Sequence, residues 1–137
     1  MKKTLLLLLI INLTCMYGQE DSKIIEEFRY GFDESVSIIN LIASPEKYHN
    51  KKIQVIGYLN IEFEGNGIYL HKEDYDNGIE KNGLWVSFTK KTWEKLKKKK
   101  INKTYVIIEG TFNMEDKGHM GLFSGEIEKI TRIDKWN

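Results

Sequence analysis

The chain of 137 residues contains very little cysteine and proline, and it has almost no net charge. Cys15 is the only cysteine and lies near the N-terminus, so a disulfide within the chain is impossible. Pro45 is the only proline, and no proline-rich or other low-complexity linker divides the sequence. The formal net charge is +1, and overall charge therefore gives no indication of nucleic acid or an anionic membrane as partner.

Several catalytic and metal-binding motifs are missing as well. The three histidines, His49, His71 and His119, lie in separate segments without the spacing of a zinc site. The acidic segment 71–78 does not match a calcium loop, because Gly78 takes a position that needs an oxygen ligand. The glycine-rich segment 118–125 contains neither a phosphate loop nor a nucleophile elbow. We therefore expect a non-enzymatic protein with no cofactor and no metal.

The N-terminus, by contrast, has the pattern of a secretory signal peptide. Two lysines precede the apolar stretch Leu5–Leu13, and Gly18 supplies a small residue just before a cleavage site. The stretch is too short to span a bilayer, which takes roughly 20 apolar residues. We therefore expect residues 1–18 to be removed and the exported protein to begin at Gln19, in the periplasm or outside the cell.

Cys15 supports a second hypothesis about the same segment, in which the protein is a lipoprotein anchored through an acylated cysteine. The match is poor, because Asn12 and Thr14 stand where lipoprotein signals normally have leucine and a small residue. A free exported protein is therefore our prediction, with the lipid anchor as the alternative. No second long apolar run follows, so we expect no transmembrane segment.

After a polar lead-in over residues 19–34, the pattern predicts one domain over residues 35–137. Apolar spacing predicts a helix over 35–43 capped by Ser35, and another over 92–99 with Trp93 and Leu96 on one face. Ser44 and Pro45 predict a further helical turn, and residues 73–78 a turn or short helix.

Alternating apolar residues predict five strands, and Gly57 and Gly110 stand inside two of them. A glycine within a strand is typical of a bulge or a bend, as small barrels require. The predicted strands cover residues 53–63, 68–70, 84–88, 104–112 and 124–133. Five strands with a helix between the third and the fourth predict a mainly β fold, a small five-stranded OB-like barrel with one or two short helices.

The stretch "LIASPEKYHNKKIQVIGYL" carries a resemblance that agrees with this fold. Pro45, Tyr48 and Lys51 form a Pro-x-x-Tyr-x-x-Lys turn that leads into the strand containing Gly57. This arrangement resembles OB-fold domains of small exported bacterial proteins. The segments "IYLHKEDYDNG", "LWVSF", "YVIIEGTF" and "GHMGLFSGEI" are similar to uncharacterised members of that group, so the likeness covers about residues 36–134. It implies an architecture and no activity.

Eight lysines and a single acid, Glu94, lie between Lys90 and Lys103, giving this stretch a local charge of +7. Such a stretch could bind phosphate or an anionic surface, although it contains no arginine for bidentate phosphate contacts. The simpler interpretation is a solvated helix that Trp93 and Leu96 attach to the barrel.

Aromatic residues recur in the predicted strands, and two interpretations remain open. They could stack on the bases of a single-stranded nucleic acid or pack in the core. Export argues against nucleic acid as the partner. These residues are Tyr58, Tyr69, Trp85, Tyr105 and Phe112.

We expect the chain to be a binding module for a small molecule, a glycan or a protein. Loop placement predicts a ligand cleft near five residues, which are His71, Tyr75, Trp85, His119 and Phe123. One alternative is a small periplasmic hydrolase that uses His71 or His119 with a carboxylate. The other is a protein-interaction or inhibitor-type domain that docks through the lysine-rich helix.

Overall fold

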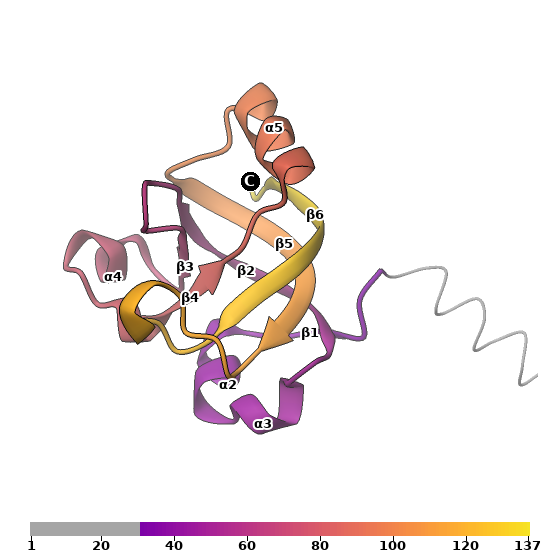
Figure 1. Cartoon of the computed structure of the whole chain (residues 1–137), viewed down its shortest axis with the longest axis vertical. Coiled ribbons are helices and arrows are strands. Elements are labelled where there is room, and N and C mark those ends of the chain that lie inside the picture. Colours follow the sequence, from indigo (N-terminus) through magenta and orange to yellow (C-terminus); the bar gives the residue numbers. More distant parts are fainter. Residues whose placement is uncertain (1–30) are drawn as a thin grey trace, which may run out of the picture. The chain divides into compact units, whose positions relative to one another are not determined.

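In the computed structural model, which describes residues 31–137, five strands curve into a closed barrel and a sixth short strand flanks it (Figure 1). The barrel order is β2-β3-β4-β6-β5 and back to β2; only the β4–β6 pair is parallel within the barrel. The strands are β1 (Glu34–Ser35), β2 (Lys52–Asn60), β3 (Gly67–Tyr69), β4 (Gly83–Val86), β5 (Thr104–Asn113) and β6 (Glu126–Lys135). The predicted mainly β, OB-like barrel is confirmed.

The predicted signal peptide, Cys15 and the lead-in as far as residue 30 lie outside the described residues. Residues 32–137 form one compact unit. Within it β1 pairs in parallel with the first part of β2, and β3 pairs with the last part of the same strand edge. The short β1 therefore covers an edge of β2 that β3 leaves open.

The described residues contain four short α-helices: two at the predicted helices, and two of about one turn at the predicted helical turn after Ser44 and the predicted turn or short helix 73–78. They are α2 (Ile38–Ala43), α3 (Pro45–Tyr48), α4 (Lys72–Asp76) and α5 (Lys90–Lys99), with 3₁₀ turns η1 (Glu80–Asn82) and η2 (His119–Gly121). Helices as short as α3 and α4 leave almost no periodic signal, because they complete barely one turn. Over residues 31–137, no helix combines the length and apolar character needed to cross a bilayer.

Local capping explains where two helices begin. Ser35 lies in β1 rather than capping a helix, and the hydroxyl of Ser37 instead accepts from the backbone N–H of Asn40 at 3.2 Å. Helix α5 begins two residues earlier than predicted, because Thr89 accepts from the backbone N–H of Thr92 at 3.2 Å.

The two strand glycines serve different purposes. Gly110 marks a register shift between β5 and β6, where a Cβ atom would lie 2.7 Å from the carbonyl oxygen of Glu128. The predicted bulge is thus present there. Gly57 lies in regular pairing, but a Cβ would lie 2.6 Å from the carbonyl oxygen of Tyr69 and 2.8 Å from Ile38. It permits close packing of β2 against β3 and α2.

The core fills the barrel, and helices pack at both of its ends (Figure 1). Strand residues such as Val55, Ile68, Leu84 and Ile108 point inward and are completely or almost completely buried. Residues Ile38 and Leu41 of α2 and Tyr48 of α3 join the same core, as do Leu96 of α5 and Ile101 just beyond it. Apolar burial of this kind is the main stabilising contribution to a domain of this size.

Candidate functional site

Three of the five predicted site residues, Tyr75, Trp85 and Phe123, belong to one continuous row of aromatic rings outside the barrel. Phe123 lies 5.5 Å from Trp85 and 6.0 Å from Tyr69, measured between ring centroids. Tyr75 of α4 lies 5.8 Å from Tyr69 and continues the row through Tyr58, at 5.9 Å. Tyr58 and Tyr105 end it at 5.6 Å. The structure therefore brings these three residues together.

Strand register explains this row. Tyr58 pairs with Tyr69 on one side and with Tyr105 on the other. Since side chains alternate between the two faces of a strand, all three point outward while their neighbours point into the barrel. Phe112, the fifth strand aromatic, faces inward and is fully buried in the core.

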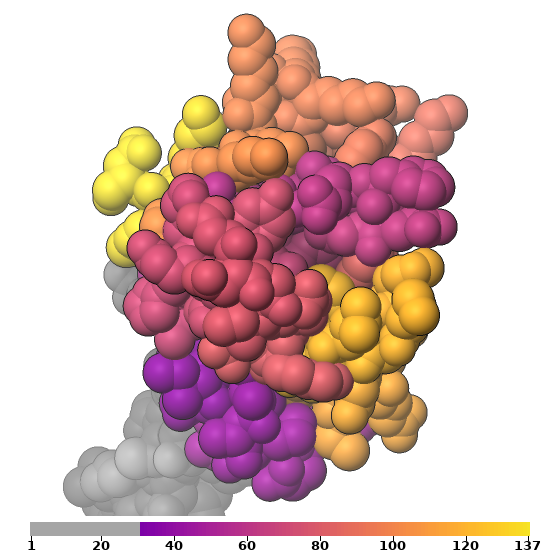
Figure 2. All heavy atoms as spheres, turned by 90° about the vertical axis from the view of Figure 1, so that its left-hand side faces the viewer, coloured from indigo at the N-terminus to yellow at the C-terminus, as the bar shows by residue number. Residues whose placement is uncertain are grey.

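The chain's own segments cover most of this aromatic row. Only 4% of Tyr58 and of Tyr69 is exposed, and 2% of Phe123. Figure 2 shows the segment around α4 and η1 meeting the segment around η2 on this side of the molecule, where Lys81 donates to the carbonyl of Gly121 at 3.1 Å. The row acts as a second packed layer, so it offers no open stacking platform at Tyr58 or Tyr69.

The covered position also changes the chemistry of Tyr69. Burial is the main cause that raises the pKa of its hydroxyl to about 12, and the carboxylates of Glu80 and Glu62 add to it. Tyr69 therefore stays neutral at any physiological pH.

The two predicted histidines lie outside the row, and both are exposed. His71 caps α4, where its backbone N–H donates to the carboxylate of Asp74 at 3.2 Å. His119 lies on η2 with its Nε2 atom 3.8 Å from a carboxylate oxygen of Glu64. This contact links the β2–β3 loop to the β5–β6 loop, but both side chains are open to solvent. Across residues 31–137, no three histidine, cysteine or acidic side chains are grouped closely enough to hold a metal ion.

A pocket of about 340 Å³, called here the Trp93 pocket, lies in a different place, beside the C-terminal half of α5. Its apolar lining comes from Trp93 and Leu96 of α5, Ile101 just after the helix and Ile61 at the end of β2. Lys97 and Lys100 add two ammonium groups, and Lys97 lies 5.6 Å from the centre of the Trp93 ring. The volume lies within the usual range for small-molecule sites, about 300–1,000 Å³. None of the five predicted site residues lines it.

Two features hold this pocket in shape. The side-chain amide of Asn102 exchanges two hydrogen bonds with the backbone of Ile61, at 2.8 and 3.0 Å. At the helix end, the backbone N–H of Ile101 donates to the carbonyl of Leu96 at 3.1 Å, and that of Lys100 to Lys97 at 3.2 Å. These two bonds form a Schellman motif, in which Lys100 takes the left-handed conformation that glycine normally supplies, with φ 51°.

The sequence contained part of the signal for this pocket. The helical pattern identifies Trp93 and Leu96 as the apolar side of the helix, which by itself predicts packing against the barrel. Lys97 and Lys100 follow them at four-residue spacing, which places an ammonium group one helical turn beyond each apolar side chain. Ile61 and Asn102, however, carried no signal, because their approach depends on the closure of the barrel.

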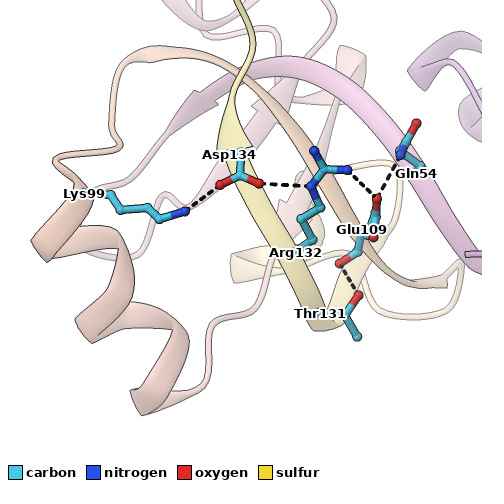
Figure 3. Close-up of polar contacts among 6 residues, drawn as sticks. All are labelled: Gln54, Lys99, Glu109, Thr131, Arg132 and Asp134. Carbon is cyan, nitrogen blue, oxygen red and sulfur yellow. Dashed lines mark hydrogen bonds and ion pairs between the residues drawn. The ribbon is translucent and has the colours of Figure 1, made fainter. Parts of the chain in front are cut away.

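On the opposite flank of α5, a chain of ion pairs connects the helix to the barrel (Figure 3). Lys99 lies 2.5 Å from Asp134, whose second oxygen accepts from Arg132 at 3.0 Å. Arg132 also donates to Glu109 at 3.1 Å, and Glu109 accepts from Gln54 at 2.8 Å. Lys99 first and Arg132 second lower the pKa of the Asp134 carboxyl below its ordinary value.

Comparison with known proteins adds no assignment to this geometry. The chain matches no protein-family model, and a search of curated proteins finds no similar sequence.

Proposed function

We propose that the chain is an exported binding module that takes a small amphiphilic anion into the pocket beside α5. The ligand would carry an aromatic ring or a short acyl chain together with a carboxylate, phosphate or sulfonate group. The single observation behind this proposal is the pocket itself, which combines an apolar wall with two lysines. Apolar pockets with a few polar groups are the common form of small-molecule sites in proteins.

Each part of the ligand has a counterpart in the pocket. The wall made by Trp93, Leu96 and Ile101 favours an apolar group, since its contact would remove apolar surface from water. The ammonium groups of Lys97 and Lys100 favour an anion at the rim. Asn102 is already occupied by Ile61, so it contributes shape rather than a free hydrogen-bonding group.

Export is part of the proposal and is supported by the residues 1–18 and by the resemblance to small exported bacterial proteins. The intact mass of the exported protein tests it. A mass that begins at Gln19 supports a free protein in the periplasm or outside the cell. A diacylated mass that begins at Cys15 supports the lipid-anchored alternative, and an uncleaved chain contradicts export by either route.

Binding can be tested with octanoate and naphthalene sulfonate as anionic probes and with octanol and naphthalene methanol as their neutral counterparts. We expect the anions to raise the thermal unfolding temperature in a saturable way and the neutral compounds to do so less. Lys97→Ala should weaken anion binding, whereas Lys98→Ala removes the same charge one residue away and outside the pocket lining. Equal losses in both variants would indicate general electrostatic attraction and contradict the proposed site.

A variant that fills the space gives a second test. Ile61→Trp enlarges a pocket-lining side chain and leaves the Ile61 backbone free to keep its bonds to Asn102. We expect this variant to fold and to lose binding of all four probes. Retained binding would place the ligand elsewhere on the molecule.

A further inference from the structure

A second hollow, of about 150 Å³, lies between the N-terminal half of α5 and β6, on the flank opposite the Trp93 pocket. Lys91, Thr92 and Lys95 line it from α5, and Thr131 and Arg132 from β6. Ile130 and Ile133 complete its lining. It is polar where the Trp93 pocket is apolar, and it shares no residue with that pocket.

Helical spacing places Lys91, Lys95 and Lys99 in one row along α5, because residues four apart share a helix face. This row faces β6, as the ion pair between Lys99 and Asp134 shows. Lys99 is the only member of the row with an acidic partner in the described part of the chain. Lys91 and Lys95 line the crevice without one.

The neighbouring acids are already used. Asp134 and Glu109 lie against Lys99 and Arg132, so two carboxylates balance two cations in that network (Figure 3). Within residues 31–137 neither Lys91 nor Lys95 has an ion-pair partner, and Glu94, the one acid of α5, forms no ion pair with either lysine. Two lysines four residues apart on a helix also repel each other, which is a cost that a bound anion would remove.

Arg132 lines the crevice and is held in place by two acids. Its Nε atom donates to Asp134 and its Nη1 atom to Glu109, while within residues 31–137 no hydrogen bond involves Nη2. These bonds fix the guanidinium plane and leave one nitrogen to donate. Thr131 donates to the carbonyl of Glu109 at 3.4 Å, and Thr92 shares its hydroxyl with Thr89 at 2.9 Å. The free ammonium donors of the crevice are thus Lys91 and Lys95, and Arg132 lines it with a guanidinium already bound to Asp134 and Glu109.

We propose that the α5–β6 crevice is a subsite for a tetrahedral oxyanion, the phosphate group of a monoester. Two unpaired ammonium groups of α5 and the Arg132 side chain of β6 line a space several times larger than one water molecule, whose share of liquid volume is about 30 Å³. A doubly charged oxyanion matches the two unpaired lysines in charge, and its oxygens can accept from both ammonium groups at once. This subsite shares no residue with the Trp93 pocket, so a negative result at one site does not contradict the other.

Inorganic phosphate and sulfate are the first probes, titrated at constant ionic strength against chloride and followed by the amide resonances of the protein. We expect saturable shifts at Thr92, Thr131 and their neighbours, and none around Asn102. The double variant Lys91→Gln with Lys95→Gln should weaken binding by at least about tenfold, since two charge-assisted contacts are lost. Both side chains are exposed, so the variant should fold.

The matched control is Lys90→Gln with Lys98→Gln, which removes the same charge from lysines of α5 outside the crevice. We expect this control to change affinity by less than about twofold, because charges in high-dielectric surroundings contribute little. Equal losses in both double variants, or shifts that never saturate, would show an adventitious ion only and overturn the proposal.

A co-sedimentation experiment with lipid vesicles distinguishes the two sources of a phosphate ester, a lipid headgroup and a soluble ester. Binding of glycerol phosphate together with co-sedimentation on vesicles that contain phosphatidic acid, a lipid with a phosphate monoester, supports a lipid headgroup as the ligand. Binding of glycerol phosphate alone supports a soluble ester. Vesicle binding that the control double variant weakens as much as the crevice variant contradicts the subsite.

Discussion

Asn102 holds Ile61 in place through both ends of its side-chain amide. The Oδ1 atom accepts from the Ile61 N–H at 2.8 Å, and the Nδ2 atom donates to the Ile61 carbonyl at 3.0 Å. The side chain thus replaces the strand that would otherwise pair with Ile61, and β2 ends at Asn60. The same contact fixes one wall of the Trp93 pocket to the segment that follows α5.

Replacing Asn102 by alanine removes both bonds to Ile61. We expect a loss of about 1–3 kcal/mol in the free energy of unfolding, at about 0.5–1.5 kcal/mol for each hydrogen bond. Urea unfolding followed by circular dichroism measures it. Asn40→Ala is the control, since Asn40 is an exposed residue of α2 and should show no loss. An unchanged Asn102→Ala protein would mean that water satisfies the Ile61 backbone equally well.

Replacing Lys100 by glycine should stabilise the protein by about 0.5–1 kcal/mol. Lys100 has φ 51° at the end of α5, a conformation that is unfavourable for residues with a Cβ atom and readily adopted by glycine. Lys98→Gly, inside the helix, should instead destabilise it by about 0.5–1 kcal/mol. Denaturant unfolding of both variants measures the contrast, and the same sign in both would contradict it. Under the proposed function, Lys100→Gly should bind the anionic probes more weakly although it is more stable.

Gly118 and Gly121 allow a steric contact to be separated from backbone strain. Both have positive φ, but a Cβ atom at Gly118 would lie 2.5 Å from the ring of Trp85, whereas one at Gly121 would meet nothing within 4 Å. Gly121→Ala should therefore cost about 1 kcal/mol, and Gly118→Ala at least about 1–3 kcal/mol more. Thermal unfolding measures both, and Trp85 emission should change only in Gly118→Ala. Equal costs would show that the contact with Trp85 relaxes freely.

Glu126 predicts a pH dependence of stability. Burial raises the pKa of its carboxyl, an effect only partly offset by the hydroxyl of Ser87, which donates to it. As pH rises from about 4.3, the ordinary glutamate value, the unfolded state loses this proton before the folded state does, so stability falls. Glu126→Gln keeps an acceptor for Ser87 and removes the titration. We expect the variant to gain stability over the native protein as pH rises.

Unfolding in urea at several pH values between 4 and 7 measures this difference. Glu94→Gln provides the control, because Glu94 is exposed on α5 and its replacement removes the same charge. A stability difference that stays constant with pH in Glu126→Gln would refute the assigned burial effect.

The barrel could be predicted because its strands follow a simple code. Ile53, Val55 and Leu59 stand at alternate positions of β2 and are all buried in the core. This alternation alone identifies a strand with one buried face. The bulge at Gly110 was likewise readable from a glycine in a strand. Helix α4 was less accessible, since His71 and Asp74 stabilise it through a local capping box rather than through periodicity.

The candidate sites, too, could be predicted from the sequence only in part. The sequence predicts Tyr75, Trp85 and Phe123 near one another, and they share an aromatic row, but the burial of Phe123 depends on the α4 and η2 segments covering that row. For the hollows beside α5 the sequence indicates only the helix side, with its apolar face and its lysines, and not the residues that meet it. Asn102 meets Ile61 across 41 residues, and Lys95 faces Arg132 from a separate element.

The sequence alone therefore determined which residues form the strands, which face of α5 is apolar and where its lysines gather. Local patterns contain that information, because side-chain direction follows backbone periodicity within one element. Only the tertiary structure decided that one flank of α5 borders an apolar pocket and the other a polar crevice. Barrel closure brings Ile61 and Asn102 together on one side and sets Arg132 beside the lysine row on the other, and no local pattern encodes such a meeting.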